Sequence, residues 1–170
     1  MLLLDRSPGR VAGEQQVTVG DDTGNPAAWG LWFHGRPDSG IRPWVDLFVA
    51  NTAILPEIAA SLGPGGSLMV AYEADETERC LRRRVPPVAT PLGRELLRAG
   101  CSWFKDWYYP EGGKEGGTKL QGTLPLDEQH RRTARRRLSA EVERYIARRA
   151  AGEQDRERAR EALRLLQSGT

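Results

Sequence analysis

Three short runs of β-favouring residues in the first third of the chain restrict its fold more than any other feature. The runs are Val17–Val19, Trp29–Phe33 and Trp44–Val49, and the links between them contain "DDTGNP" and "GRPDSG". Gly, Pro, Asn and Asp are the residues that tight turns favour. Links this short join antiparallel neighbours, because a parallel crossover needs a dozen or more residues. The sequence therefore predicts an antiparallel meander.

The pattern after this meander changes to helices and strands in alternation. The segment that begins at Thr52 predicts a helix with Thr52 as its N-cap, and the "GPGG" of residues 63–66 ends it. The apolar run Ser67–Tyr72 then predicts a short buried strand.

Two more helix starts and one more strand are expected before residue 110. Asp75 and Glu78 have capping-box spacing, which indicates a short helix. Thr90 and Pro91 are a natural N-cap and first-turn pair for another helix. The run "CSWFKDWYY", residues 101–109, is interpreted as the last strand, and a glycine-rich loop follows it.

The chain from Leu126 onward reads as helical and basic. Residues 126–170 hold 12 Arg and 8 Asp or Glu, and the acidic residues are interleaved with the basic ones. That pattern is typical of a solvated helix with i,i+4 ion pairs, so nucleic-acid binding is disfavoured. A narrow apolar stripe recurs at helical spacing and must be buried on the body or on a second copy, which makes a homo-oligomer one expected partner: Leu138, Val142, Tyr145 and Ile146.

Lysine usage marks one stretch of the chain as the candidate site. The chain has 22 Arg and three Lys, and Lys105, Lys114 and Lys119 all lie in "WFKDWYYPEGGKEGGTKLQ". On a strand, Trp103, Lys105 and Trp107 would share one face. Lys differs from Arg as a compact, titratable point charge. We therefore expect these five residues to bind a ligand, although packing of the aromatic residues in a core is the alternative.

Several other classes of site and location are disfavoured. Cys80 and Cys101 form no CxxC pair, and neither His34 nor His130 has a second imidazole at ligand spacing. A metal site is thus not expected. No apolar run approaches the length of a signal peptide core or a membrane span, so a cytoplasmic protein with no membrane partner is expected.

The segment "VDLFVANTAILPEIAASLGPGGSLMVAYE" resembles the later half of a class I methyltransferase, where a strand, a helix, a Pro-Gly-Gly turn and a strand occur in this order. The strand–GxGxG–helix unit that binds S-adenosylmethionine in that family has no counterpart in the chain. The resemblance therefore implies a methyltransferase-like remnant without a cofactor site.

The order meander, helix, strand, helix, strand is similar to the fold of the GNAT acyltransferase superfamily over residues 16–110. This resemblance implies a sheet of GNAT-like order and acyl-coenzyme A as a cofactor. The glycine-rich loop with which that superfamily binds coenzyme A is absent from the corresponding turn, Val49–Ala53. The cofactor is therefore left unknown.

A narrower resemblance rests on "GIRPWVDLF", "VPPVATPLG" and "WFKDWYYPEGGKEGGTKLQGTLP". These motifs resemble an archaeal and bacterial family of proteins of unknown function, domain family 1122, over most of residues 29–125. The resemblance implies no established activity and no catalytic residue.

The predicted fold is α+β, with a mixed, mainly antiparallel sheet of GNAT-like order. Its domain spans residues 16–125, after a loose lead-in of residues 1–15 and before an Arg-rich helical tail of residues 126–170. The leading functional hypothesis is a divergent acyltransferase-like protein that binds an anionic small molecule. In it Glu73 or Tyr109 would act as acid or base. The alternative is a non-catalytic binding or assembly module, so the sequence leaves open whether the chain is an enzyme.

Overall fold

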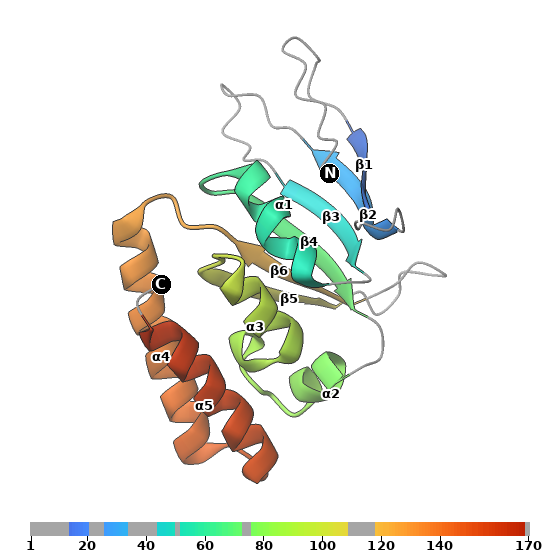
Figure 1. Ribbon diagram of the computed structural model, residues 1–170. Helices are drawn as coiled ribbons and strands as arrows, with labels where there is room; N and C mark the ends of the chain where they lie inside the picture. Colours follow the sequence, from blue (N-terminus) through green and yellow to red (C-terminus); the bar gives the residue numbers. More distant parts are fainter. Residues whose placement is uncertain are drawn as a thin grey trace.

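A six-stranded mixed sheet forms the centre of the computed structural model, which describes residues 14–20, 26–33, 44–49, 52–72, 76–108 and 118–168. The strand order is β1-β2-β3-β4-β6-β5 (Figure 1). The strands are β1 (Glu14–Gly20), β2 (Pro26–Phe33), β3 (Trp44–Val49), β4 (Ser67–Tyr72), β5 (Trp103–Tyr108) and β6 (Thr118–Thr123). The predicted α+β class with a mixed sheet is confirmed.

Strand pairing follows the lengths of the links between strands. β1, β2 and β3 form the predicted antiparallel meander. β3 and β4 pair in parallel, from Trp44 opposite Ser67 to Phe48 opposite Ala71, because a helix carries the chain back between them. β4, β6 and β5 complete the sheet with two antiparallel pairs, so that β5 lies at its edge.

The helices begin and end mostly where local sequence signals place them. They are α1 (Leu55–Leu62), α2 (Glu76–Arg82), α3 (Pro91–Arg98), α4 (Glu128–Arg148) and α5 (Glu153–Gln167), with 3₁₀ turns η1 (Thr52–Ile54) and η2 (Pro87–Ala89). The predicted cap at Thr90 is confirmed, since its Oγ1 accepts a hydrogen bond from the backbone N–H of Gly93 at 3.0 Å.

The predicted N-cap at Thr52 is wrong. Residues Thr52–Ile54 form the 3₁₀ turn η1, and α1 begins only at Leu55, so that Pro56 falls in its first turn, where a missing N–H costs no helical hydrogen bond. The predicted stop is confirmed, because Gly63 and Gly65 both have positive φ. Asp75, the first residue of the predicted capping box, lies outside the described residues.

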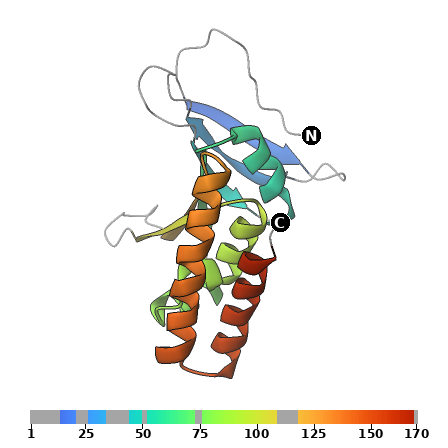
Figure 2. The same cartoon turned by 90° about the vertical axis from the view of Figure 1, so that its left-hand side faces the viewer.

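The described helices lie on one side of the sheet (Figures 1 and 2). α1 and α3 pack against it and bury one side of each central strand, which supplies the main hydrophobic core. Burying one Leu or Val side chain in such a core stabilises the folded state by ~1.5–3 kcal/mol relative to leaving it exposed. The fully buried large side chains of this core come from three strands and two helices: Val45, Leu55, Leu68, Val70, Leu96 and Leu120.

A second core joins the α4–α5 hairpin to the body. Leu138, Val142 and Tyr145 of the predicted stripe are buried there against η2, α3 and α5, and Ile146 packs at its margin. The stripe is therefore covered within one chain, so a homo-oligomer stays a prediction that requires another surface. Among the described residues, no helix combines the length and the apolar character that a membrane span needs.

Strand β6 is absent from the sequence-based prediction, which took "CSWFKDWYY" as the last strand. Its sequence, TKLQGT, contains a single large apolar residue, Leu120, and a glycine, Gly122. Strand propensity is weak for such a segment. Tertiary packing forms it nonetheless: Leu120 is fully buried, and a Cβ on Gly122 would lie 2.7 Å from the Cys101 sulfur. Lys119 thus lies in a strand rather than in the loop.

Candidate functional site

The side of β4, β6 and β5 that faces away from α1 and α3 is the first part of the candidate site. We call it the open face, because all nine of its side chains are half-buried or exposed. Strand register aligns them in rows of three, in the order β4, β6, β5: Ser67, Thr123 and Trp103; Met69, Gln121 and Lys105; Ala71, Lys119 and Trp107.

The structure brings four of the five predicted ligand-binding residues together on this face. Trp103, Lys105 and Trp107 alternate along β5, and Lys119 is the cross-strand partner of Trp107 on β6. Neither indole is sealed in the core, since Trp103 is 39% exposed and Trp107 is half-buried. Lys114 lies outside the described residues, as do Glu73 and Tyr109, so their predicted roles stay predictions.

Lys105 covers the ring of Trp107. Its Nζ lies 3.9 Å from the ring centroid, a cation–π contact that is worth ~0.5–1 kcal/mol at an exposed site. None of the ion pairs in the described part of the chain involves Lys105. Because Lys105 covers the Trp107 ring, Trp103 is the more accessible of the two indoles for stacking.

A hydrogen-bonded ladder fixes the rest of the open face. Trp107 Nε1 donates to Gln121 Oε1 at 2.8 Å, and Gln121 Nε2 donates to Thr123 Oγ1 at 3.1 Å and to Ser67 Oγ at 3.3 Å. The Ser67 and Thr123 hydroxyls are themselves 2.8 Å apart. These groups satisfy one another, so they orient Trp107 without requiring a ligand.

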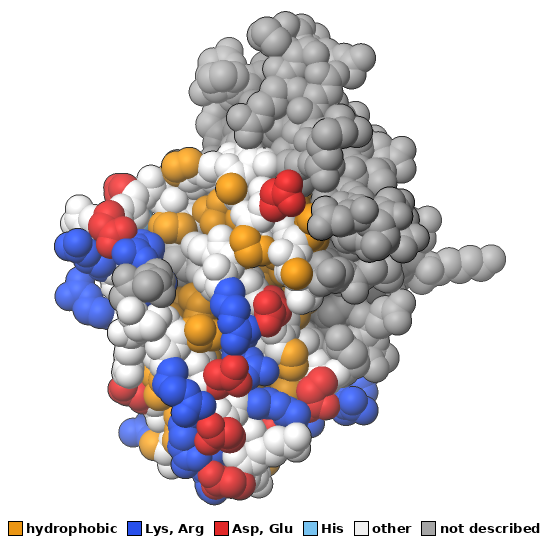
Figure 3. Space-filling view, viewed as in Figure 1, with side chains coloured by type: hydrophobic (Ala, Val, Ile, Leu, Met, Phe, Trp, Pro, Cys, Tyr) orange, Lys and Arg blue, Asp and Glu red, His pale blue; other side chains and the backbone are white. Residues whose placement is uncertain are grey.

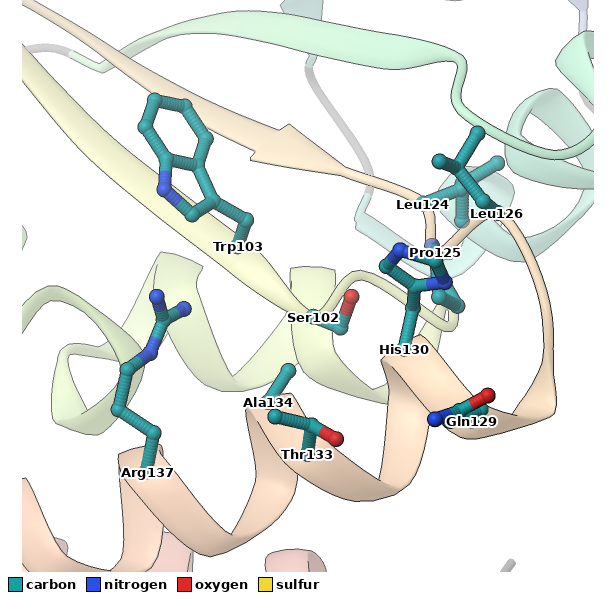
Figure 4. Close-up of a pocket in the computed structure, with 10 residues that line it drawn as sticks. All are labelled: Ser102, Trp103, Leu124, Pro125, Leu126, Gln129, His130, Thr133, Ala134 and Arg137. Atoms are coloured by element: carbon teal, nitrogen blue, oxygen red, sulfur yellow. The ribbon is translucent and has the colours of Figure 1, made fainter.

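A hollow of about 470 Å³ adjoins the open face at Trp103 (Figure 4). We call it the tryptophan hollow. It lies between the start of β5, the link that leads from β6 to α4, and the first half of α4. Its lining is mostly apolar with several polar groups: Ser102, Trp103, Leu124, Pro125, Leu126, Gln129, His130, Thr133, Ala134 and Arg137.

The N-cap of α4 positions the polar side of this hollow. Asp127 Oδ1 accepts hydrogen bonds from the backbone N–H of His130 at 2.8 Å and from its ring Nδ1 at 2.7 Å. The first of these bonds contributes most to lowering the pKa of the Asp127 carboxyl. Asp127 therefore holds the His130 ring at the hollow while it starts the helix.

Arg137 supplies a cation to the same hollow. Figure 4 shows its side chain reaching from α4 toward β5 and Trp103. It is exposed, and it takes part in no ion pair of the described residues. The sequence did not predict a binding role for Arg137, His130 or Leu126, because they lie in a segment that is typical of a solvated helix. The Pro-Leu-Asp run before α4, an apolar residue beside an N-cap, was the available signal.

Both thiols lie away from the candidate site's chemistry. Cys101 is 2% exposed, and burial raises its pKa to about 12. Burial also raises the pKa of the fully buried Cys80. Neither is suited to act as a nucleophile near neutral pH. Within the described residues, no group of three or more His, Cys, Asp or Glu side chains gathers as a metal site.

Comparison with known proteins places the chain in a family. A solved structure titled as a protein of unknown function from Aquifex aeolicus VF5 shares 28% sequence identity with it, at a TM-score of 0.73. The match covers 93% of this chain and 84% of the other. Among curated proteins no similar sequence is found. The family model described as "Protein of unknown function (DUF1122)" matches residues 1–149, and the chain therefore belongs to this family.

Proposed function

We propose that the protein binds a small anionic molecule with a planar apolar part, in the tryptophan hollow and on the open face beside it. One observation supports this more than any other. Among the residues whose side-chain burial the structure describes, the exposed large hydrophobic side chains are Trp103, at 39%, and Leu126, at 40%, and both line this one hollow. Single exposed apolar residues are ordinary, but two in one concave site of ligand size favour a binding role.

The charges around the hollow favour an anionic ligand. Arg137 lies at the hollow, and Lys105 follows Trp103 by two residues on the same face of β5, about 7 Å along the strand. An apolar wall with a cation at each end suits a flat ring that carries a carboxylate, sulfonate or phosphate. Binding by these residues requires neither Glu73 nor Tyr109.

A divergent acyltransferase of GNAT type is the second candidate function. It is favoured by the one parallel pair among the described strands, β3–β4, which lies between antiparallel strands. A cofactor site of that type opens where two parallel neighbours splay apart at their carboxyl ends. β3 and β4 instead stay paired as far as Phe48 opposite Ala71, one residue before each strand ends. This continuity favours the non-catalytic binding module.

The proposed site can be tested with 8-anilino-1-naphthalenesulfonate, a fluorescent probe with planar rings and one negative charge. We expect Trp103→Ala to weaken binding about tenfold, because it removes the stacking surface. We expect Arg137→Gln to weaken binding roughly fivefold, since it removes the neighbouring cation. Fluorescence titration measures both dissociation constants.

Arg136→Gln is the matched control. Arg136 is an exposed neighbour of Arg137 on α4, and it does not line the hollow. The control should bind the probe as the unmodified protein does, and all three variants should keep their thermal midpoints. Equal binding by Trp103→Ala and the unmodified protein would refute the proposal.

The acyltransferase alternative has a separate test. A thermal-shift screen with acyl-coenzyme A species, S-adenosylmethionine and nucleotides detects any true ligand, because a ligand at a hundred times its dissociation constant stabilises by ~2.7 kcal/mol. A shift with acyl-coenzyme A that Trp103→Ala leaves intact would favour the acyltransferase.

A further inference from the structure

The arginines of the α4–α5 hairpin divide into two groups by their partners. On α5, Arg156, Arg158, Arg160 and Arg164 each form an ion pair. Figure 3 shows the result as basic and acidic side chains interleaved over the lower part of the molecule, where α5 lies. Such pairing is what a solvated, charge-balanced helix predicts. The arginines of the second half of α4 do not follow this pattern.

The arginines at the end of α4 instead line a second hollow, of about 520 Å³, between the end of α2, η2, β5 and the second half of α4. We call it the arginine hollow. Four arginines line it, Arg84, Arg144, Arg148 and Arg149, together with two carboxylates, Asp106 and Glu141. All four arginines are exposed, and none takes part in an ion pair of the described residues. The hollow therefore carries an excess of positive charge.

Arg84 is held at this hollow by a strained backbone. Its φ is +61°, the one positive value among described residues other than glycine. Its N–H donates to Leu81 O and the N–H of Val85 donates to Cys80 O, both at 3.0 Å, which is the Schellman pattern at the end of α2. Glycine is the usual residue at that position because a Cβ is disfavoured there. An arginine at such a position favours the hypothesis that its side chain has a use.

The helix dipole accounts for only part of this cluster. Arg148 and Arg149 lie at the carboxyl end of α4, where basic residues interact favourably with the dipole. Arg144 lies a full turn earlier, and Arg84 comes from another element. Glu141, Arg144 and Arg148 follow at i, i+3 and i+7, so they share one side of α4, the side that lines the hollow.

We propose that the arginine hollow binds a small ligand that carries two or more phosphate groups. Guanidinium groups pair bidentately with phosphate oxygens, and four of them, which outnumber the two carboxylates of the lining, can contact more than one phosphate group. The volume suits a small molecule rather than an extended strand. This site shares no lining residue with the tryptophan hollow and is independent of the function proposed for it.

Titration of inorganic pyrophosphate, followed by calorimetry, tests the site directly. We expect Arg148→Gln and Arg84→Gly each to weaken pyrophosphate binding about tenfold. Arg84→Gly also reports on folding, because glycine relieves the left-handed residue and should raise the thermal midpoint by roughly 2 to 4 °C in a chain of this size. Arg136→Gln, which removes one charge from α4 outside the hollow, should bind as the unmodified protein does.

A nucleoside diphosphate and a single-stranded oligonucleotide complete the experiment. Tighter binding of the diphosphate than of pyrophosphate would identify a nucleotide as the source of the phosphates, and equal binding would favour an inorganic or other polyphosphate. The proposal is overturned if the dissociation constant of pyrophosphate is above about 1 mM. It is also overturned if Arg136→Gln weakens pyrophosphate binding as much as Arg148→Gln does. It is equally overturned if only the oligonucleotide binds, or if Arg84→Gly is stabilised with unchanged affinity.

Discussion

The ion pair between Arg83 and Asp155 fastens the α4–α5 hairpin to the body, and its loss should measurably destabilise the fold. Arg83 donates from Nε and Nη2 to the two carboxylate oxygens of Asp155, each at 3.0 Å. Arg158 donates to the same carboxylate at 3.2 Å and forms an ion pair with Glu76 of α2 at 2.7 Å. We predict that Asp155→Asn loosens this attachment.

The magnitude follows from the exposure of the partners. Breaking a fully buried ion pair costs ~3–5 kcal/mol, whereas an exposed pair is worth at most ~1 kcal/mol. The Asp155 side chain is 7% exposed, but that of Arg83 is 38% exposed, which places the pair between these limits. We therefore expect a loss of about 2 kcal/mol in the free energy of unfolding. That loss corresponds to a fall of about 4 to 8 °C in the thermal midpoint.

Urea denaturation of a double-mutant cycle measures the pair itself. Asp155 is also the third residue of α5, where a carboxylate interacts with the helix dipole, so the single variant overstates the pair. Asp155→Asn, Arg83→Gln and the double variant should give a coupling free energy of about 1 kcal/mol. A coupling indistinguishable from zero would refute the view that this pair fastens the hairpin.

The same pair predicts a dependence on pH. The hydrogen bonds from Arg83 are the largest cause that lowers the pKa of the Asp155 carboxyl below its ordinary 3.8. A lowered folded-state pKa means that the stabilisation is present above the unfolded-state value and is lost as the pH falls below it. The difference in stability between the unmodified protein and Asp155→Asn should therefore shrink in acid below that value.

Three further predictions concern the two cores. Gly93→Ala should destabilise by about 3 kcal/mol in urea denaturation, because its Cβ would lie 1.7 Å from the carbonyl oxygen of Pro87. Tyr145→Phe should be neutral or stabilise by up to ~1 kcal/mol, since the buried Tyr145 hydroxyl has no hydrogen-bond partner in the part of the chain that the structure describes; a clear loss would contradict this. The pKa of Cys101 is raised to about 12 in the folded state from an ordinary 9.0. The free energy of unfolding should therefore fall by up to ~1.4 kcal/mol per pH unit as the pH rises between these two values. The fall should be smaller in Cys101→Ala.

Local signals in the sequence predicted those elements whose ends are fixed by backbone chemistry. The meander followed from turn residues, and the start of α3 followed from Thr90 and Pro91. The stripe from Leu138 to Tyr145 predicted a buried side of α4 because a helix repeats every 3.6 residues. The prediction of Thr52 as an N-cap failed because a 3₁₀ turn precedes α1. No local sequence signal distinguishes this turn from the first turn of an α-helix.

The candidate site was predictable only where it lies on one strand. The alternation of Trp103, Lys105 and Trp107 was readable from the sequence because a strand repeats every two residues. The ladder through Gln121 required β6, whose pairing partners are distant in sequence and whose own residues are mostly polar. Both hollows require α4 to lie beside β5, and no local pattern indicates that placement, although the Pro-Leu-Asp run marks the start of α4.

One side of α4 contributes to both hollows, and this explains why they differ in character. His130, Ala134 and Arg137 line the tryptophan hollow, and Glu141 and Arg148 line the arginine hollow. Successive members are separated by three, four or seven residues, so they form one continuous row along the helix. Near its start the row faces the exposed Trp103 and Leu126, whereas near its end it meets Arg84 and further arginines of its own. A single helix, fastened by Arg83 and Asp155, thus places an apolar recess and a basic recess beside the same edge strand, β5. Because the two recesses share this wall, loosening the hairpin with Asp155→Asn should weaken the binding of both 8-anilino-1-naphthalenesulfonate and pyrophosphate. Trp103→Ala should weaken only the binding of 8-anilino-1-naphthalenesulfonate, and Arg148→Gln only that of pyrophosphate.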